Sequence, residues 1–101
     1  MRELFAVTLK KGSGWNAKEP MRSQAHWDEH AALMDQWTAD GFILLGGPIG
    51  EGEDEVLIVF DAADEDEILT AFAADPWLIL HIRELAQIRQ WKILLEAEKK
   101  D

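Results

Sequence analysis

The sequence predicts a small α+β domain with the element order βαββαβ. Four apolar segments of strand length and two helical segments follow one another in that order. Glycine and proline mark the ends of several segments, as expected for turns. No repeat, low-complexity linker or change of composition divides the chain of 101 residues. This length suits one domain with a modest core, so we expect residues 1–101 to form a single domain.

The first half of the chain supplies a strand, a long loop and a helix. ELFAVTL (3–9) is a strand by its length and residue types. KKGSGWNAKEP (10–20) is a long loop because glycines and a proline interrupt it. The following segment predicts a helix from near Met21 to about Asp40, with Gly41 as its C-terminal stop.

The middle of the chain predicts a pair of strands. FILLGGP (42–48) is a second strand that ends in a turn, and VLIVFDA (56–62) is a third strand. The acidic segment EGEDE (51–55) between them is short enough for a tight hairpin connection. These two strands are therefore expected to pair directly.

The last third begins with a second helix. Asp64 and Glu67 form a capping-box pattern at its start, and the helix should end near Asp75, before Pro76. The remaining elements are a short helical turn around Trp77–His81, a last strand at about Ala86–Leu95, and a charged tail.

Short connections and right-handed crossovers place these elements in an antiparallel four-stranded sheet with two helices on one face, a ferredoxin-like fold. The strands do not alternate cleanly between apolar and polar residues. In the first strand Phe5, Val7 and Leu9 point to one side, but Leu4 and Ala6 on the other side are also apolar. A second subunit is the simplest cover for the face without helices, so we expect a homodimer through the open sheet face.

Charge and composition exclude several classes of partner. The net charge is −10 and the pI is about 4.6, so a nucleic-acid backbone would be repelled. Cysteine is absent, which excludes disulfides, thiol nucleophiles and thiolate metal sites. The N-terminal residues do not resemble a secretory signal, and no apolar run approaches about 18 residues. We therefore expect a soluble cytoplasmic protein without a membrane or nucleic-acid partner.

The segment HWDEH (26–30) has the spacing of a zinc-peptidase motif, H-x-x-E-H. His26 and His30 would be the ligands and Glu29 the base. Such an enzyme needs a third ligand on a second helix and a substrate cleft, and no downstream helix offers a suitably placed His or Glu. A five-residue pattern also arises easily by chance in an acidic helix, so we expect no metal site.

Several short motifs together resemble the YCII-related domain family, whose members are small proteins of the dimeric α+β barrel type. The resemblance spans nearly the whole chain, and the motifs occur in order: Trp27 with His30, GGP (46–48), DPW (75–77) and IRQW (88–91). It implies a homodimer with a pocket in each subunit that carries a histidine and an aspartate as an acid/base pair. A few members resemble enzymes that eliminate halide from, or isomerise, ring-derived metabolites.

By position in the resemblance, the pair would be His30 and Asp75. The helical spacing of Trp27, His30, Met34 and Trp37 puts them on one stripe, so His30 should face the sheet. A carboxylate bonded to one ring nitrogen would fix the tautomer and leave the other nitrogen as a general base. Alternatively, His30 is a core histidine bonded to a backbone carbonyl, and Asp75 caps the turn that begins with proline; one carboxylate can do both.

The topology gathers four segments at one mouth beside this pair: the loop around Trp15, the start of the first helix, the GGP turn and the DPW turn. The candidate substrate-binding residues are Trp15, Trp27, Met34, Gly46, Gly47, Pro48 and Trp77. The two glycines are explained equally well by the turn that ends the strand.

Trp37 and Trp91 are expected in the core and the interface. His81 and Arg83 could bind an anionic substrate, but a surface position or pairing with carboxylates is the simpler interpretation.

Two functions from different classes remain open. The first is a cofactor-independent enzyme that moves a proton on a small cyclic or aromatic metabolite, in an elimination or isomerisation. No cofactor is expected, since the sequence has no dinucleotide-binding fingerprint, P-loop or nucleophile elbow. The second is a non-catalytic dimeric module for small-ligand binding or assembly, with His30 as a structural residue. This second function includes a haem-binding version, because the resemblance extends to α+β barrels that hold haem on a histidine.

Overall fold

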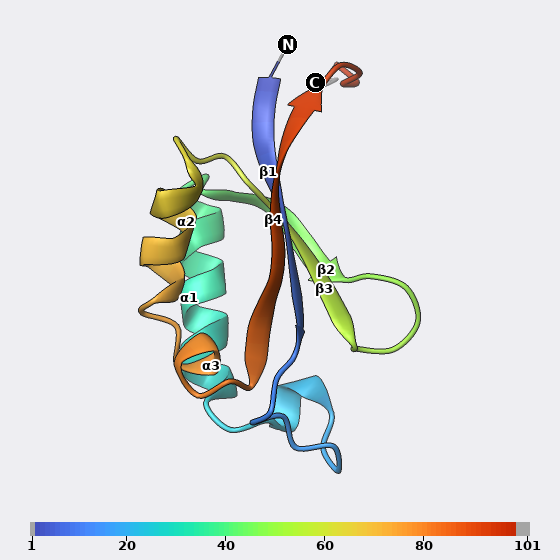
Figure 1. Cartoon of the computed structure of the whole chain (residues 1–101), viewed down its shortest axis with the longest axis vertical. Helices are drawn as coiled ribbons and strands as arrows, with labels where there is room; N and C mark the ends of the chain where they lie inside the picture. The colour runs from blue at the N-terminus through green and yellow to red at the C-terminus, as the bar shows by residue number, and fades with distance from the viewer. Residues whose placement is uncertain (1, 99–101) are drawn as a thin grey trace.

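The computed structural model describes residues 2–98, which form a four-stranded antiparallel sheet with its helices on one face (Figure 1). The strand order is β2-β3-β1-β4, so the fold is the ferredoxin-like arrangement predicted from the sequence. The elements are β1 (Arg2–Lys11), the 3-10 helix η1 (Met21–Ser23), α1 (Trp27–Ala39), β2 (Ile43–Pro48), β3 (Glu55–Phe60), α2 (Glu65–Phe72), α3 (Pro76–Ile79) and β4 (Arg83–Ile93). Of the expected charged tail, residues 99–101 lie outside the described part of the chain.

The core fills the space between the helices and one face of the sheet. Strands β1 and β3 pair in a register that places Phe5 opposite Phe60 and Val7 opposite Ile58. These side chains are buried, together with Ile68 and Phe72 of α2 and with Leu9 and Ile43. The side of the first strand that carries Phe5, Val7 and Leu9 is thus the face that the helices cover.

The capping box at the start of α2 is present. The Asp64 side chain accepts a hydrogen bond of 2.9 Å from the backbone N–H of Glu67, and the Glu67 carboxylate accepts one of 3.0 Å from the N–H of Ala63. Because two otherwise unpaired donors are satisfied in this way, the helix begins at the predicted place. It ends at Phe72, a few residues earlier than expected.

The predicted start of the first helix is wrong. Helix α1 begins at Trp27 and not near Met21, because the chain between them is held in a loop by Gln24. The buried Gln24 side chain accepts from the N–H of Asn16 at 2.8 Å and donates to the carbonyl groups of Asn16 (2.8 Å) and Glu19 (2.9 Å). These bonds stabilise the loop in place of a further turn of helix. His30 therefore lies in the first turn of α1 and not well along a longer helix.

The last strand begins earlier than predicted. Strand β4 starts at Arg83, where it pairs with Lys11 at the end of β1. The register shifts between Thr8 and Leu9, which face Gln87 and Leu85, so Ala86 is the extra residue of a β-bulge. Because one extra residue reverses which side chains face the helices, the bulge points Leu85 and Arg83 to the helix side.

The face of the sheet opposite the helices is bare in Figure 1. By register, Trp91 opposite Leu4 and Leu45 opposite Val59 point to this face, and they are 49% and 64% exposed although Leu45 also borders the cavity described below. Other residues of this face, such as Leu4 and Val59, are buried within the chain. Among residues 2–98 no helix has the length and apolar character to cross a membrane.

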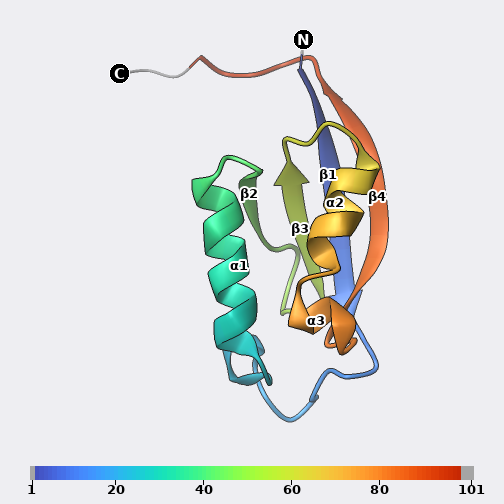
Figure 2. The same ribbon diagram turned by 90° about the vertical axis from the view of Figure 1, so that its left-hand side faces the viewer.

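One end of the molecule collects the segments that the sequence predicted would meet there. Figure 2 shows the loop after β1, the start of α1 and the short helix α3 at the same end. This follows from the topology, because β1 runs toward this end, α1 leads away from it, and α2 returns to it. The candidate site lies here.

Candidate active site

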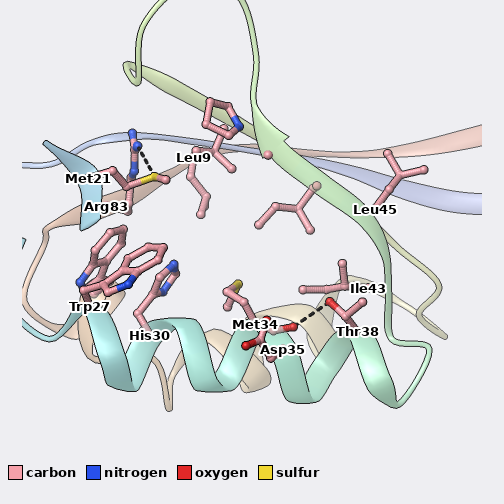
Figure 3. Close-up of a pocket in the computed structure, with 16 residues that line it drawn as sticks. Leu9, Met21, Trp27, His30, Met34, Asp35, Thr38, Ile43, Leu45 and Arg83 are labelled. Atoms are coloured by element: carbon pink, nitrogen blue, oxygen red, sulfur yellow. Dashed lines mark hydrogen bonds between the residues drawn. The ribbon is translucent and has the colours of Figure 1, made fainter. Parts of the chain in front are cut away.

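A cavity of about 440 Å³ lies between α1 and the sheet (Figure 3). This volume is in the range of small-molecule sites. Helix α1 forms one wall, strands β2 and β3 form the opposite wall, and α3 and the start of β4 close one end. The lining residues are Leu9, Met21, Trp27, His30, Met34, Asp35, Thr38, Ile43, Leu45, Gly46, Gly47, Pro48, Val56, Ile58, Trp77 and Arg83.

His30 and Asp75 form a buried hydrogen-bonded pair at this end of the cavity. The His30 Nδ1 atom lies 2.8 Å from Asp75 Oδ2, the Asp75 side chain is fully buried, and the His30 side chain is 10% exposed. An ionised carboxylate can only accept, so Nδ1 carries the hydrogen and donates it. The remaining nitrogen, Nε2, then has its lone pair free, and no described residue bonds to it.

Asp75 is held in place by a second bond. Its Oδ1 atom accepts from the backbone N–H of Trp77 at 2.9 Å, which makes Asp75 the N-cap of α3, with Pro76 as the first helical residue. The two roles left open by the sequence, cap and histidine partner, are thus filled by the two oxygens of one carboxylate. A capped helix start fixes the carboxylate and, through it, the ring of His30.

The His30 ring stacks on Trp77. The ring centroids are 4.0 Å apart and the planes are nearly parallel, at 6°. Trp77 is itself buried, and its Nε1 donates to the carbonyl of Ala25 at 2.7 Å. Trp27 packs against both rings, with centroids 6.0 Å from His30 and 5.6 Å from Trp77. Trp77 therefore contacts one face of the His30 ring and Asp75 bonds to its edge, so Nε2 has a defined position.

Most of the predicted substrate-binding residues line the cavity. Trp27 and Met34 come from α1, Gly46 to Pro48 from β2, and Trp77 from α3. Neither glycine has a positive φ. A Cβ on Gly46 would lie 3.2 Å from the Ile58 side chain and 3.3 Å from the Leu57 carbonyl, so close approach to β3 explains this glycine, whereas a Cβ on Gly47 would meet nothing within 4 Å.

Trp15 has a different place. Its ring meets Trp77 edge-on at 6.0 Å and covers the guanidinium of Arg83 at 4.5 Å, but it is not among the residues that line the cavity. It contacts two residues that line the cavity. Direct contact between Trp15 and a ligand stays a prediction.

The HWDEH segment has the local geometry of a helix start. His26 is the N-cap of α1 in a left-handed conformation (φ 60°), so only His30 lies within the helix. The Nδ1 atom of His26 is 2.9 Å from the Glu29 carboxylate, on the surface. The two histidines thus have separate carboxylate partners. Among the described residues, no three His, Asp or Glu side chains come together as a metal-binding group.

For Arg83 the sequence favoured a surface position or pairing with carboxylates over binding of an anionic substrate, and the surface position is wrong. The side chain lines the cavity and is 1% exposed. Burial lowers the pKa of Arg83 from its usual value, while the nearby charges of Glu53 and Asp54 act in the opposite direction. An arginine stays protonated under these conditions, so a cation is buried beside the cavity. His81, the other residue considered, is exposed.

Comparison with known proteins supports the fold. No protein-family model matches the sequence, and no curated protein sequence matches it. Among solved structures, the chain is similar to 5-chloro-2-hydroxyhydroquinone dehydrochlorinase (TftG) from Burkholderia phenoliruptrix AC1100, in a complex with 2,5-dihydroxybenzoquinone. The two chains share a fold. The TM-score is 0.54, and the match covers 89% of this chain and 92% of TftG at 20% sequence identity. The finer resemblance to the YCII-related family stays a prediction.

Proposed function

We propose that this protein is a cofactor-independent enzyme that eliminates a group from, or isomerises, a small ring-derived compound, with His30 and Asp75 as its acid/base pair. The observation that carries the proposal is the 2.8 Å hydrogen bond between these side chains at the end of a cavity of about 440 Å³. A histidine oriented by a carboxylate, with its second nitrogen free, is the arrangement that general base catalysis needs.

The reaction follows from the state of the two ring nitrogens. His30 Nε2 would take a proton from a carbon or hydroxyl group of the substrate, and Asp75 would stabilise the imidazolium that forms. In an elimination, the electron pair of the broken bond forms a new double bond and a leaving group departs as an anion. In an isomerisation, His30 returns the proton to another atom of the same substrate.

The cavity lining favours a substrate with a largely apolar ring. Most lining side chains are aromatic or aliphatic, including Trp27, Met34 and Ile43. On the opposite wall, Gly47 has no side chain, and the space where its Cβ would be is open. The dehydrochlorinase with the similar fold is named for a chlorinated hydroquinone. A ring compound of this kind is therefore the class of substrate that we would test first.

We further propose that the working form is a homodimer. Leu45 and Trp91 are large apolar side chains that are 64% and 49% exposed on the sheet face without helices. In a symmetric dimer, this face of one copy would pack against the same face of the second copy and bury these side chains.

Replacement of His30 by Asn tests the proposed reaction. Turnover of chlorinated hydroquinones, followed by chloride release and by chromatography of the ring products, should fall by about 10²–10⁴, the usual contribution of a positioned base. His26→Asn is the matched control, because His26 is exposed and not in the cavity, and Asn tolerates its left-handed backbone. Unchanged turnover in His30→Asn, with a loss of stability only, would favour the non-catalytic ligand-binding or assembly module.

A further inference from the structure

We propose that Arg83 binds an anionic oxygen of the ligand, so that the cavity selects ring compounds that carry a carboxylate or an ionised hydroxyl group. The assignment of these compounds as substrates rests on the proposed function above. The binding of the anion itself does not, because it depends on Arg83 and the cavity and not on proton transfer by His30.

The first support is the incomplete bonding of a buried cation. Arg83 is 1% exposed, and its side chain has five N–H donors. One terminal nitrogen donates to the carbonyl of Asp54 at 3.1 Å, and the other is 3.9 Å from the sulfur of Met21, which is a weak acceptor. The Nε atom is buried without any partner among the described residues. A buried donor without an acceptor is costly, so the site is built for a group that the described chain does not supply.

The second support is that the acids near Arg83 do not form a direct ion pair with it. No described Asp or Glu forms an ion pair with Arg83. The two nearest acids have other partners: Asp54 pairs with Lys11 at 2.8 Å, and Glu53 accepts from the backbone N–H of Met21 at 3.0 Å. A buried charge is normally paired, and an anionic ligand would provide the missing partner.

The third support is a β-bulge in β4, which directs the Arg83 side chain toward the cavity. The β-bulge at Ala86 reverses the alternation of β4, so that Arg83 faces the helices together with Leu85. In an unbroken strand it would face away from them. Trp15 covers one face of the guanidinium at 4.5 Å, which fixes its plane. A fixed planar guanidinium suits two-point recognition of a carboxylate or of neighbouring ring oxygens.

Arg83 and His30 lie at the same end of the cavity, as Figure 3 shows. They are connected through contacting rings, because His30 stacks on Trp77 and Trp77 meets Trp15, which covers Arg83. A ring compound can therefore direct a charged oxygen to Arg83 while another of its atoms approaches Nε2 of His30. If the oxygen is conjugated with the carbon that loses a proton, Arg83 also stabilises the negative charge that develops there.

A binding experiment with two related quinones tests the inference without requiring turnover. The probes are 2,5-dihydroxybenzoquinone, which is an anion near neutral pH, and 2,5-dimethoxybenzoquinone, which has the same ring and no charge. Quenching of tryptophan fluorescence would report both affinities. Wild-type protein should bind the anion at least about tenfold more tightly, and Arg83→Met should remove that preference with little change for the neutral ring. Arg83→Lys should keep part of the preference, because it keeps the charge.

Two controls separate the outcomes. Lys18→Gln makes the same change of net charge at an exposed loop position and should preserve the preference. His30→Asn should also preserve it, so that unchanged turnover in this variant, with the anion preference retained, would contradict only the proposed reaction. Equal affinity of the wild-type protein for both quinones, or a preference that persists in a folded Arg83→Met variant, would overturn the inference. If Arg83→Met does not fold, the wild-type comparison and Arg83→Lys still decide it.

Discussion

His30 and Asp75 are 45 residues apart in the sequence, yet their side chains meet at 2.8 Å inside the protein. The contact depends on two local structures. Helix α1 presents His30 to the sheet, and the capped start of α3 fixes Asp75. The same carboxylate therefore links helix stability to the orientation of the candidate base, and the two effects can be separated by mutation.

Asp75→Asn should change the tautomer of His30 with little loss of stability. Asn is as good an N-cap as Asp, so α3 should remain capped. The Asn amide can donate to Nδ1, which would move the ring hydrogen to Nε2 and remove the free lone pair from the cavity. Long-range ¹H–¹⁵N correlation spectra of the imidazole would show the change. Turnover of a ring substrate should fall by about 10² or more. A variant that retains the hydrogen on Nδ1 would contradict this account.

Gly46→Ala and Gly47→Ala should differ although the two residues are adjacent and line the same cavity. The added methyl group at Gly46 would lie 3.2 Å from Ile58 and 3.3 Å from a backbone oxygen of β3, whereas at Gly47 it meets nothing within 4 Å. We expect Gly46→Ala to lower the free energy of unfolding by about 1–3 kcal/mol and Gly47→Ala to leave it nearly unchanged. Urea unfolding of both variants would measure the difference. Equal effects would show that the strand can shift to make room.

Gln24→Ala should destabilise the loop before α1. The amide of Gln24 bonds to three backbone groups, and its removal leaves them to find water. We expect a loss of about 1–3 kcal/mol in the free energy of unfolding, with faster amide exchange in residues 16–24 than in the sheet. Gln36→Ala is the control, since Gln36 is exposed on α1 and bonds only to Asp40 at 2.9 Å. Similar losses in both variants would mean that Gln24 does not hold the loop.

Trp91→Glu should disrupt the proposed dimer. A charge placed on the open sheet face would be buried by the second subunit at high cost, so the variant should be monomeric at concentrations where the wild-type protein is dimeric. Light scattering coupled to size exclusion would give the masses. Leu95→Glu provides the comparison, because Leu95 follows β4 and is 93% exposed. A wild-type protein that is monomeric at micromolar concentration would remove the basis of the proposal.

Residue types and spacing were enough to predict the fold, whereas the candidate pair also needed the family resemblance. The strands and helices follow from short-range patterns, such as the apolar run of strand length in β1 and the Asp64 and Glu67 capping box, which local forces decide. The inward position of His30 follows from helical spacing. Its contact with Asp75 was expected from the topology and the family resemblance together, and the structure has the buried pair.

Tertiary contacts decided the rest. Gln24 stabilises the loop before α1 because its side chain bonds to backbone groups five and eight residues earlier, and residue type alone does not mark it as a loop residue. Arg83 faces the cavity because β4 pairs with β1 through a bulge at Ala86, and a shift of one residue in register is invisible to residue type. The sequence by itself determined the elements and the inward histidine. Only the paired strands determined that a buried cation shares the cavity with it.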